Sequence, residues 1–365
     1  MKIRKMRPIR YMVLAGLLVP TFAAAQSSGS GGGVGAACAE IPMTYSADTA
    51  DFCYSVAQAV ESLQPQVGIA VAGGNVTAGS ATRGGIRLLP IPGLTLSAKL
   101  NVAAARIPDI TDPASGAGRT TRERSVPVPV VQGVAAFGLF SGFSASPTLG
   151  GIGGLDLLGS VSWLPLNSSR DFGKNSAAAA FGVGGRVTLL KESFVTPGVS
   201  LSVMYHDLGR VSYGNVCDPP GATAGFQNDE FRFESGACAG GGDPGEFNFD
   251  LQDWSTRAQV GKRFGPFGVA AGLGYDRWSS EIDYGFRGSC IGVPNCFVRV
   301  SDVQLDSDRL STFADASFGG VLGAVVGEIG WMQGSAPIGG YQAALNDFDP
   351  KSGTFFGSVG VKLSF

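Results

Sequence analysis

The chain has 365 residues, of which 15% are charged, and its 29 acidic side chains slightly outnumber its 27 basic ones. Soluble globular proteins carry about 25% charged residues, so this chain is poor in charge, and its mean hydropathy is +0.18. No uncharged apolar run of about 18 residues follows residue 25, which argues against a membrane-spanning helix. The apolar residues must therefore be distributed in some other way.

The N-terminus has the pattern of a secretory signal peptide. A basic stretch is followed by the apolar run Tyr11–Phe22 and by the small-residue cleavage site Ala23-Ala24-Ala25. We expect residues 1–25 to be removed on export. Removal takes away five of the 27 cations and none of the 29 anions, which leaves a net charge of −7. This acidity argues against nucleic acid as a partner.

Residues 26–66 differ from the rest of the chain. Gln26 to Gly35 is a Ser/Gly spacer, and between Ala47 and Leu63 the apolar residues recur at helical spacing. We expect a short helix there, clipped by a disulfide between Cys38 and Cys53, and placed in the periplasm or inside a lumen as a plug.

From residue 67 onward, the chain reads as strands with one apolar and one polar face, since apolar and polar residues alternate. About twelve strands are expected. Short links such as Gly265-Pro266 alternate with mostly longer ones, as in barrels with short periplasmic turns and long outer loops. The expected strands are 67–77, 82–89, 94–106, 127–139, 154–164, 177–190, 197–213, 246–263, 267–282, 298–318, 321–333 and 353–365.

The last of these segments alternates up to the final residue, with Phe355, Val359, Val361, Leu363 and Phe365 on one face. A chain that ends in this way resembles Gram-negative outer-membrane β-barrel proteins. The resemblance implies an all-β, transmembrane, antiparallel up-and-down barrel over residues 67–365, located in the bacterial outer membrane. It also implies that the barrel-assembly machinery recognises Phe365, and that outer-membrane lipid and lipopolysaccharide surround the barrel wall.

Four tryptophans fall near the expected outer ends of their strands: Trp163, Trp254, Trp278 and Trp331. Tryptophan favours the membrane–water interface because its ring is apolar and its N–H is polar. We therefore expect an outer aromatic girdle, with plain core packing as the alternative role.

Six cysteines occur as three closely spaced pairs: Cys38 and Cys53, Cys217 and Cys238, Cys290 and Cys296. An even number of cysteines in an exported chain favours disulfides, and each pair falls within one segment. Zinc would need further ligands, yet there is no C-x-x-C and His206 is the only histidine. We expect three local disulfides, no metal and no cofactor.

A catalytic role would depend on His206, beside Asp207 in the sequence and two or more residues from Ser200 and Ser202. Neighbouring strand residues point to opposite faces, so Asp207 is badly placed to orient His206. Outer-membrane phospholipases use a Ser–His pair on the lipid-facing wall, whereas His206 is expected to face the lumen. We therefore expect no enzymatic activity.

The alternation places many charged or titratable residues on the inner face. They would tune selectivity in a water-filled lumen and pair with one another in a narrow one. The excess of cations favours anionic or amphipathic solutes. The lumen-lining candidates are Arg87, Lys99, Asp156, Arg186, His206, Arg257, Arg263, Asp276, Asp315, Glu328 and Lys362.

Two functions follow. The first is a passive channel or uptake porin for small or amphipathic solutes, whose N-terminal plug loosely resembles that of the fatty-acid transport family in architecture alone. The alternative is a structural or surface-interaction barrel. It would use disulfide-stiffened outer loops that carry Phe226, Phe231, Phe233, Phe247 and Phe249.

Overall fold

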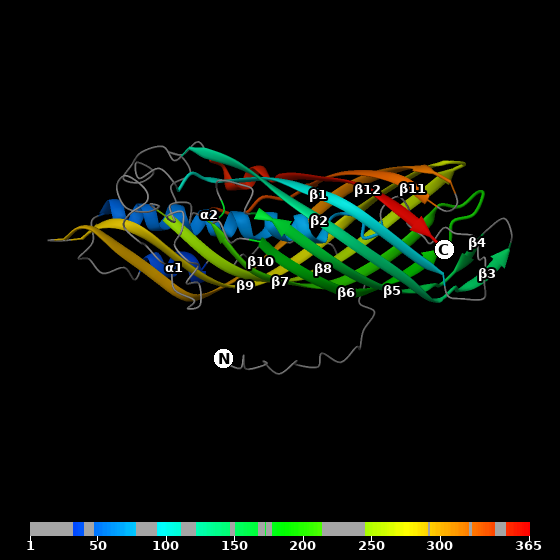
Figure 1. Ribbon diagram of the computed structural model, residues 1–365, viewed down its shortest axis with the longest axis horizontal. Coiled ribbons are helices and arrows are strands. Elements are labelled where there is room, and N and C mark those ends of the chain that lie inside the picture. Colours follow the sequence, from blue (N-terminus) through cyan, green and yellow to red (C-terminus); the bar gives the residue numbers. More distant parts are fainter. Residues whose placement is uncertain are drawn as a thin grey trace.

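The computed structural model describes residues 32–39, 47–77, 93–110, 122–146, 150–166, 172, 177–213, 245–290, 293–320, 323–339 and 348–365. Within these ranges the chain forms a closed antiparallel barrel with a helix inside it (Figure 1). No helix in the described part of the chain has the length and apolar content needed to cross a bilayer.

Ten of the described strands make the ring. Each pairs antiparallel with its neighbour along the chain, β12 pairs with β1, and the ring is complete because β6 also pairs with β7. The ring strands are β1 (Leu94–Pro108), β2 (Glu123–Phe140), β5 (Leu155–Pro165), β6 (Ala177–Leu190), β7 (Gly198–Tyr213), β8 (Gly245–Phe264), β9 (Phe267–Cys290), β10 (Val293–Gly319), β11 (Gly323–Met332) and β12 (Thr354–Ser364).

The all-β antiparallel barrel is confirmed, but the number of twelve strands is wrong. The expected strand 67–77 instead begins inside a helix that runs to Ala72, and 82–89 lies outside the described residues. A short, uniformly apolar run such as Val67–Ala72 has no period of two, so it cannot be told from a buried helix by pattern. The other ten segments each become one ring strand.

The long link expected at 140–153 holds a small hairpin outside the ring. Its strands are β3 (Phe143–Ser146) and β4 (Gly150–Ile152), and Ile152 bridges to Leu190 of β6. The expected outer loop 283–297 is also different, because β9 continues to Cys290 and β10 begins at Val293.

The two ends of the barrel differ. At one end, which we call the short-turn end, Gly265-Pro266 joins β8 to β9, and Phe365 exchanges backbone hydrogen bonds with Leu94. At the other, the long-loop end, four of the five links are much longer than this turn: 109–122, 166–176, 214–244 and 333–353. The exceptions are the short link 291–292 at the long-loop end and the link 141–154 at the short-turn end, which holds β3 and β4. The link 333–353 contains a short 3₁₀ helix, η3 (Pro350–Ser352).

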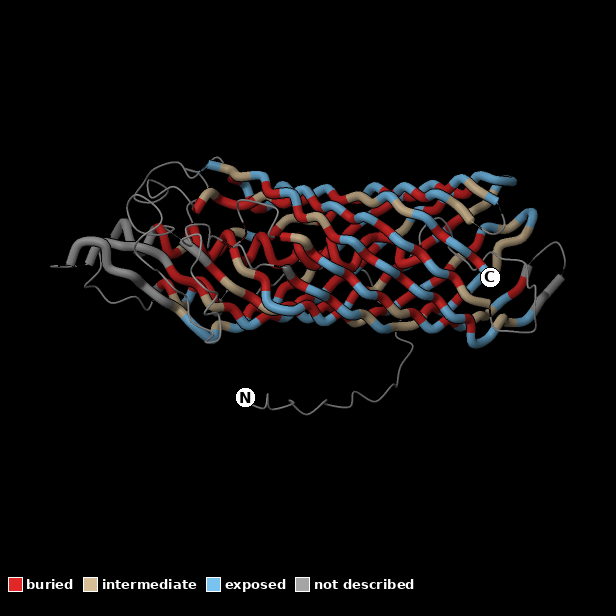
Figure 2. Tube along the Cα trace, viewed as in Figure 1, coloured by how far each residue is buried: buried red, intermediate tan, exposed pale blue. Residues whose placement is uncertain are grey.

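The outer face is apolar through the middle of the barrel, where exposed and buried residues alternate along each strand (Figure 2). Tyr205 and Trp254 form an aromatic pair with ring centroids 5.1 Å apart, and polar residues such as Asp207 follow toward the long-loop end. The strands β9 and β10 have 24 and 27 residues. About 9–11 residues cross a bilayer, so both strands project well beyond it.

The interior contains α2 (Ala47–Ala72), which lies lengthwise within the ring (Figure 1). It contacts β1, β2, β8, β9, β10 and β12. The helix begins at the predicted residue but extends past the predicted end at Leu63, through Pro65. The shorter α1 (Gly32–Ala39) is joined to it by the predicted disulfide between Cys38 and Cys53, whose Cα atoms are 5.7 Å apart.

We expect the double variant Cys38→Ser, Cys53→Ser to lower the free energy of unfolding by roughly 3 kcal/mol, because the bridge restricts a 15-residue separation in the unfolded chain. The measurement is urea unfolding of the refolded protein in detergent, followed by intrinsic fluorescence. Wild-type protein kept in reductant should match the variant. An unchanged midpoint in both would show that the bridge adds nothing.

Candidate functional site

The interior of the barrel is the candidate site. Inside the ring lie nine of the predicted lumen-lining residues, each at most 8% exposed: Lys99, Asp156, Arg186, His206, Arg257, Asp276, Asp315, Glu328 and Lys362. Arg263 is half-buried near the short-turn end, and Arg87 falls outside the described residues. The structure adds a partner that the wall pattern could not reveal, because α2 and the residues just after it contact several of these side chains.

The half of the interior toward the long-loop end is an apolar core. Val56, Val60 and Leu63 of α2 are fully buried there. The wall contributes Tyr213, Phe247, Phe249, Ile282 and Tyr284, which belong to the same core. This part of α2 is therefore packed as the interior of a soluble domain would be.

Trp278 belongs to this core, so its assignment to the outer girdle is wrong. It is 0% exposed and faces α2, where a Cβ on Gly68 would lie 2.0 Å from its Nε1. Trp278 is two residues from the inward-facing Asp276, and the period of two therefore places it inside. Trp163 and Trp254 do face outward, with 50% and 56% exposure, and Trp331 is half-buried.

The loop role expected for Phe247 and Phe249 is wrong as well. Both lie on β8 and are fully buried, and the Phe247 ring stacks on Tyr213 with centroids 5.0 Å apart. The cause is the length of β8, which begins at Gly245 and carries these rings inward. The expected loop residues Phe226, Phe231, Phe233, Cys217 and Cys238 lie outside the described residues, as do the side chains of Cys290 and Cys296.

The end of α2 toward the short-turn end is held by charged wall residues, which we call the socket: Lys99, Arg257, Asp315 and Glu328. Glu328 accepts hydrogen bonds from the backbone N–H groups of Gly74 (3.0 Å) and Asn75 (2.5 Å). Arg257 donates to the carbonyl oxygen of Gly73 at 2.7 Å. A helix end leaves carbonyl groups without intrahelical partners and favours cations, so Arg257 suits this position.

Asn75 completes the socket. Its side-chain amide donates to Asp315 at 2.8 Å, and its carbonyl oxygen accepts from Lys99 Nζ at 3.0 Å. Because all these partners are buried, each charge is compensated by the plug or the wall rather than by water.

Further charges pair within the wall. Arg186 bonds Asp156 at 2.7 Å, and Arg257 lies 2.8 Å from Asp276. Arg186 also donates to the hydroxyl of Thr77, beyond the end of α2. The described interior thus follows the narrow-lumen alternative, in which charges neutralise one another.

Uncharged amides hold the last third of α2, and the sequence analysis missed these residues. Gln64 donates to Ser280 at 2.8 Å and accepts from Ser307 at 2.6 Å. From the wall, Asn101 donates to the carbonyl of Ala70 at 3.0 Å, and Gln132 to that of Val71 at 2.7 Å. The inward direction of Asn101 and Gln132 was predictable from the alternation along β1 and β2, although their hydrogen-bond partners on α2 were not.

His206 has a partner that the sequence did not suggest. Its Nδ1 lies 3.0 Å from Asp253 on the neighbouring strand β8, while Asp207 is on the opposite face. On the other side of His206, Gly182 and then Ser160 lie in register. A Cβ on Gly182 would lie 2.2 Å from Ser160 Oγ and 2.9 Å from His206 Nε2, so both atoms border the space above this glycine. The side chains of Ser160, His206 and Asp253 are enclosed, at 7% exposure or less.

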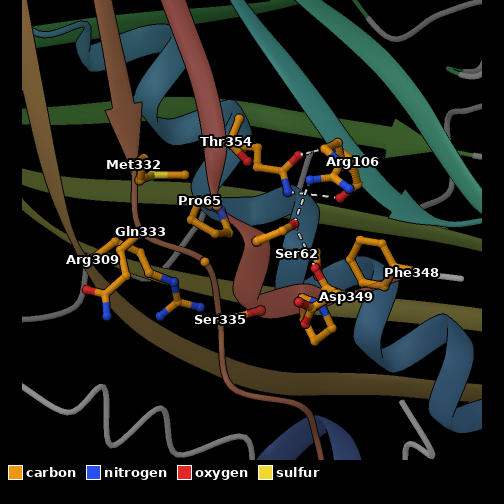
Figure 3. A pocket seen from close by; sticks show the side chains of 15 residues that line it. Ser62, Pro65, Arg106, Arg309, Met332, Gln333, Ser335, Phe348, Asp349 and Thr354 are labelled. Atoms are coloured by element: carbon orange, nitrogen blue, oxygen red, sulfur yellow. Dashed lines mark hydrogen bonds between the residues drawn. The ribbon is translucent and has the colours of Figure 1, made fainter. Parts of the chain in front are cut away.

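A small pocket lies beside α2 toward the long-loop end, where the link between β11 and β12 folds back over the helix (Figure 3). Arg106 and Arg309 lie on opposite sides of Pro65. Arg106 pairs with Glu123 and donates to Ser352 Oγ at 2.6 Å. The pocket is therefore bordered by contacts that fasten the link to the wall.

No family model matches the chain, and no curated protein matches it. Among solved structures, the outer membrane protease OmpT from Escherichia coli is 12% identical, with 75% of this chain and 95% of that chain covered and a TM-score of 0.31. The translocator domain of the autotransporter NalP from Neisseria meningitidis is 9% identical, with coverages of 75% and 90% and a TM-score of 0.32. The CymD monoaromatic hydrocarbon channel is 12% identical, with coverages of 80% and 98% and a TM-score of 0.24. Likenesses at this level carry no functional conclusion.

Gly68→Ala is expected to destabilise the barrel by about 1–3 kcal/mol, because the added Cβ meets the Trp278 ring in a packed interior. In an unconstrained helix the same change would stabilise the fold by about 1 kcal/mol. The sign of the change in stability therefore distinguishes a packed helix from a free one. The measurement is the temperature at which the folded, fast-migrating form is lost on gel electrophoresis. Gly327→Ala, where nothing lies within 4 Å, is the control and should leave it unchanged. A rise in this temperature for Gly68→Ala would show that the helix does not pack on Trp278.

Glu328→Gln should cost about 1–3 kcal/mol, since an amide accepts two backbone N–H groups less well than a carboxylate. Hydrogen exchange at Gly74 and Asn75 should accelerate. Glu281→Gln, on the exposed face of β9, is the matched control and should change stability by less than about 0.5 kcal/mol. Equal effects of the two substitutions would argue against the socket.

Proposed function

We propose that this chain is an outer-membrane β-barrel closed by its internal helix, which serves as a structural or surface-interaction barrel rather than an open pore. The placement is supported by the signal-peptide pattern and by the closed ring with an apolar outer face. In this proposal, lipid and lipopolysaccharide surround the wall, and the barrel-assembly machinery receives β12. We propose no enzymatic step and no cofactor, because the row from Ser160 to Asp253 is enclosed.

The apolar core around the first half of α2 is the observation that carries this proposal. Burying one large apolar side chain contributes about 1.5–3 kcal/mol, and α2 buries several, including Phe52, Val56, Val60 and Leu63. Withdrawal of the helix would lose this free energy of burial and would also leave the socket charges without partners. The packing therefore favours a helix that stays in place.

A channel or uptake porin for small or amphipathic solutes is the second candidate, and one feature favours it. The helix contacts β1, β2 and β8–β10 closely and touches β5–β7 little. The facing wall there includes small or polar residues such as Ser160, Ser162 and Gly182, beside the buried apolar side chains of Leu158 and Met204. A passage beside a retained helix would run along this side.

The deciding experiment is single-channel conductance in a planar bilayer, with the mature full-length protein beside a version that lacks residues 26–66. The closed barrel predicts no steps from the full-length protein. Steps from full-length protein would overturn it in favour of the channel. Gly182→Leu should then block those steps if the passage follows β5–β7, whereas Gly327→Leu, on the outer face of β11, should not.

A further inference from the structure

The direction in which α2 runs through the barrel has a consequence for the topology of the chain. The start of the helix lies at the long-loop end. There, Tyr284 in the projecting part of β9 donates to the carbonyl of Val34 in α1 at 3.1 Å. Ile338, in the long link between β11 and β12, donates its backbone N–H to Gln58 Oε1 at 2.8 Å.

The end of the helix lies toward the short-turn end. Its socket partners Lys99 and Glu328 each lie five residues after the start of a strand that begins at that end. With 26 residues, α2 is about 39 Å long, compared with about 30 Å for the hydrocarbon core of a bilayer. Only its last turns lie within the membrane-spanning part of the ring, because Gln66 already contacts Arg106 near the long-loop end of β1 and the residues before Gln66 lie among the projecting strands.

Together, these contacts place α1 and the disulfide on the side of the membrane opposite to Phe365 and the start of β1. A plug inserted from the short-turn side would have the reverse direction, with its first residues beside Leu94. The observed contacts exclude that arrangement for the described part of the segment.

We propose that this barrel carries its own N-terminal segment through the lumen and presents α1 on the outer surface of the cell. The short-turn end is the periplasmic end of such barrels, and an exported chain reaches the periplasm first. Residues ahead of α2 must therefore cross from the periplasmic to the outer side of the membrane as the barrel assembles. The clip between Cys38 and Cys53 and the burial of Val34 then fix α1 against the projecting strands.

Surface presentation goes beyond the proposed function, because it would hold for a conducting barrel as well as for a closed one. It assigns the projecting end a role as an anchor for a displayed N-terminal segment. It depends on the outer-membrane placement, which the experiment below tests separately.

The test inserts a short peptide epitope between Gly31 and Gly32 of the full chain and measures antibody binding on intact cells. Two reference insertions calibrate it: one after Gly339 at the long-loop end and one in the Gly265-Pro266 turn. Surface presentation predicts that the N-terminal epitope behaves like the Gly339 insertion and is seen on intact cells. Detection only after permeabilisation, as for the turn insertion, would overturn it.

Folding of each variant is checked by its heat-modifiable migration on gels. A protease site at the same N-terminal position, cut by enzyme added to intact cells, provides a second readout that needs no epitope. If the Gly339 insertion is hidden on intact cells, or if the turn insertion is visible, the proposed membrane placement and orientation fail, and the surface presentation fails with them. Those outcomes differ from a hidden N-terminal epitope beside correctly behaving references.

Discussion

The rest of the structure depends on the contact between the inner face of the ring and α2. A closed sheet satisfies its backbone hydrogen bonds internally, but the inward-facing half of every strand still needs partners. Here those partners come from a segment of the same chain, which supplies apolar side chains at one end and backbone polar groups at the other. Without the helix, the inward-facing apolar and charged side chains of the wall would lack partners. Without the wall, the apolar side chains of α2 and the polar backbone groups at its end would be exposed.

The division of the interior into two halves follows from the same constraint. Toward the long-loop end, the strands project beyond the bilayer, and their inner faces carry aromatic residues that form a core as in a soluble domain. Within the membrane, the inner face carries charges, and these are compensated by one another and by the end of the helix. The outer face changes from apolar to polar past Tyr205 and Trp254, so the two faces of the wall do not share one pattern.

Most of the wall could be predicted from the sequence, but the packing inside the barrel could not. Ten of the twelve expected strands are ring strands, and these, their inward charges and the Cys38–Cys53 bridge follow from local alternation and spacing, which are properties of single segments. Trp278 could have been placed correctly by its register with Asp276 had the interface preference of tryptophan not been given priority. Two other contacts join residues far apart in the chain: the His206–Asp253 pair and the hydrogen bond from Gln64 to Ser280. Both depend on the order of the strands and the position of the helix, which local patterns do not give. The prediction of a strand at Val67–Ala72 was wrong because a fully buried segment lacks the periodicity that distinguishes a helix from a strand.

The closing pair of strands also sets an order of events during assembly. The strand β1 follows α2 along the chain, and its partner β12 ends at Ser364, so the ring cannot close until nearly all of the chain is available. A helix that lies inside the ring, with the Cys38–Cys53 bridge near its start and the socket of the wall around its end, is most readily enclosed while the sheet is still open. Closure of β1 on β12 therefore traps α2, and it joins segments of very large sequence separation, the kind of contact that makes folding slow. The seam between the first and last strands is thus the contact whose formation encloses the helix in the barrel.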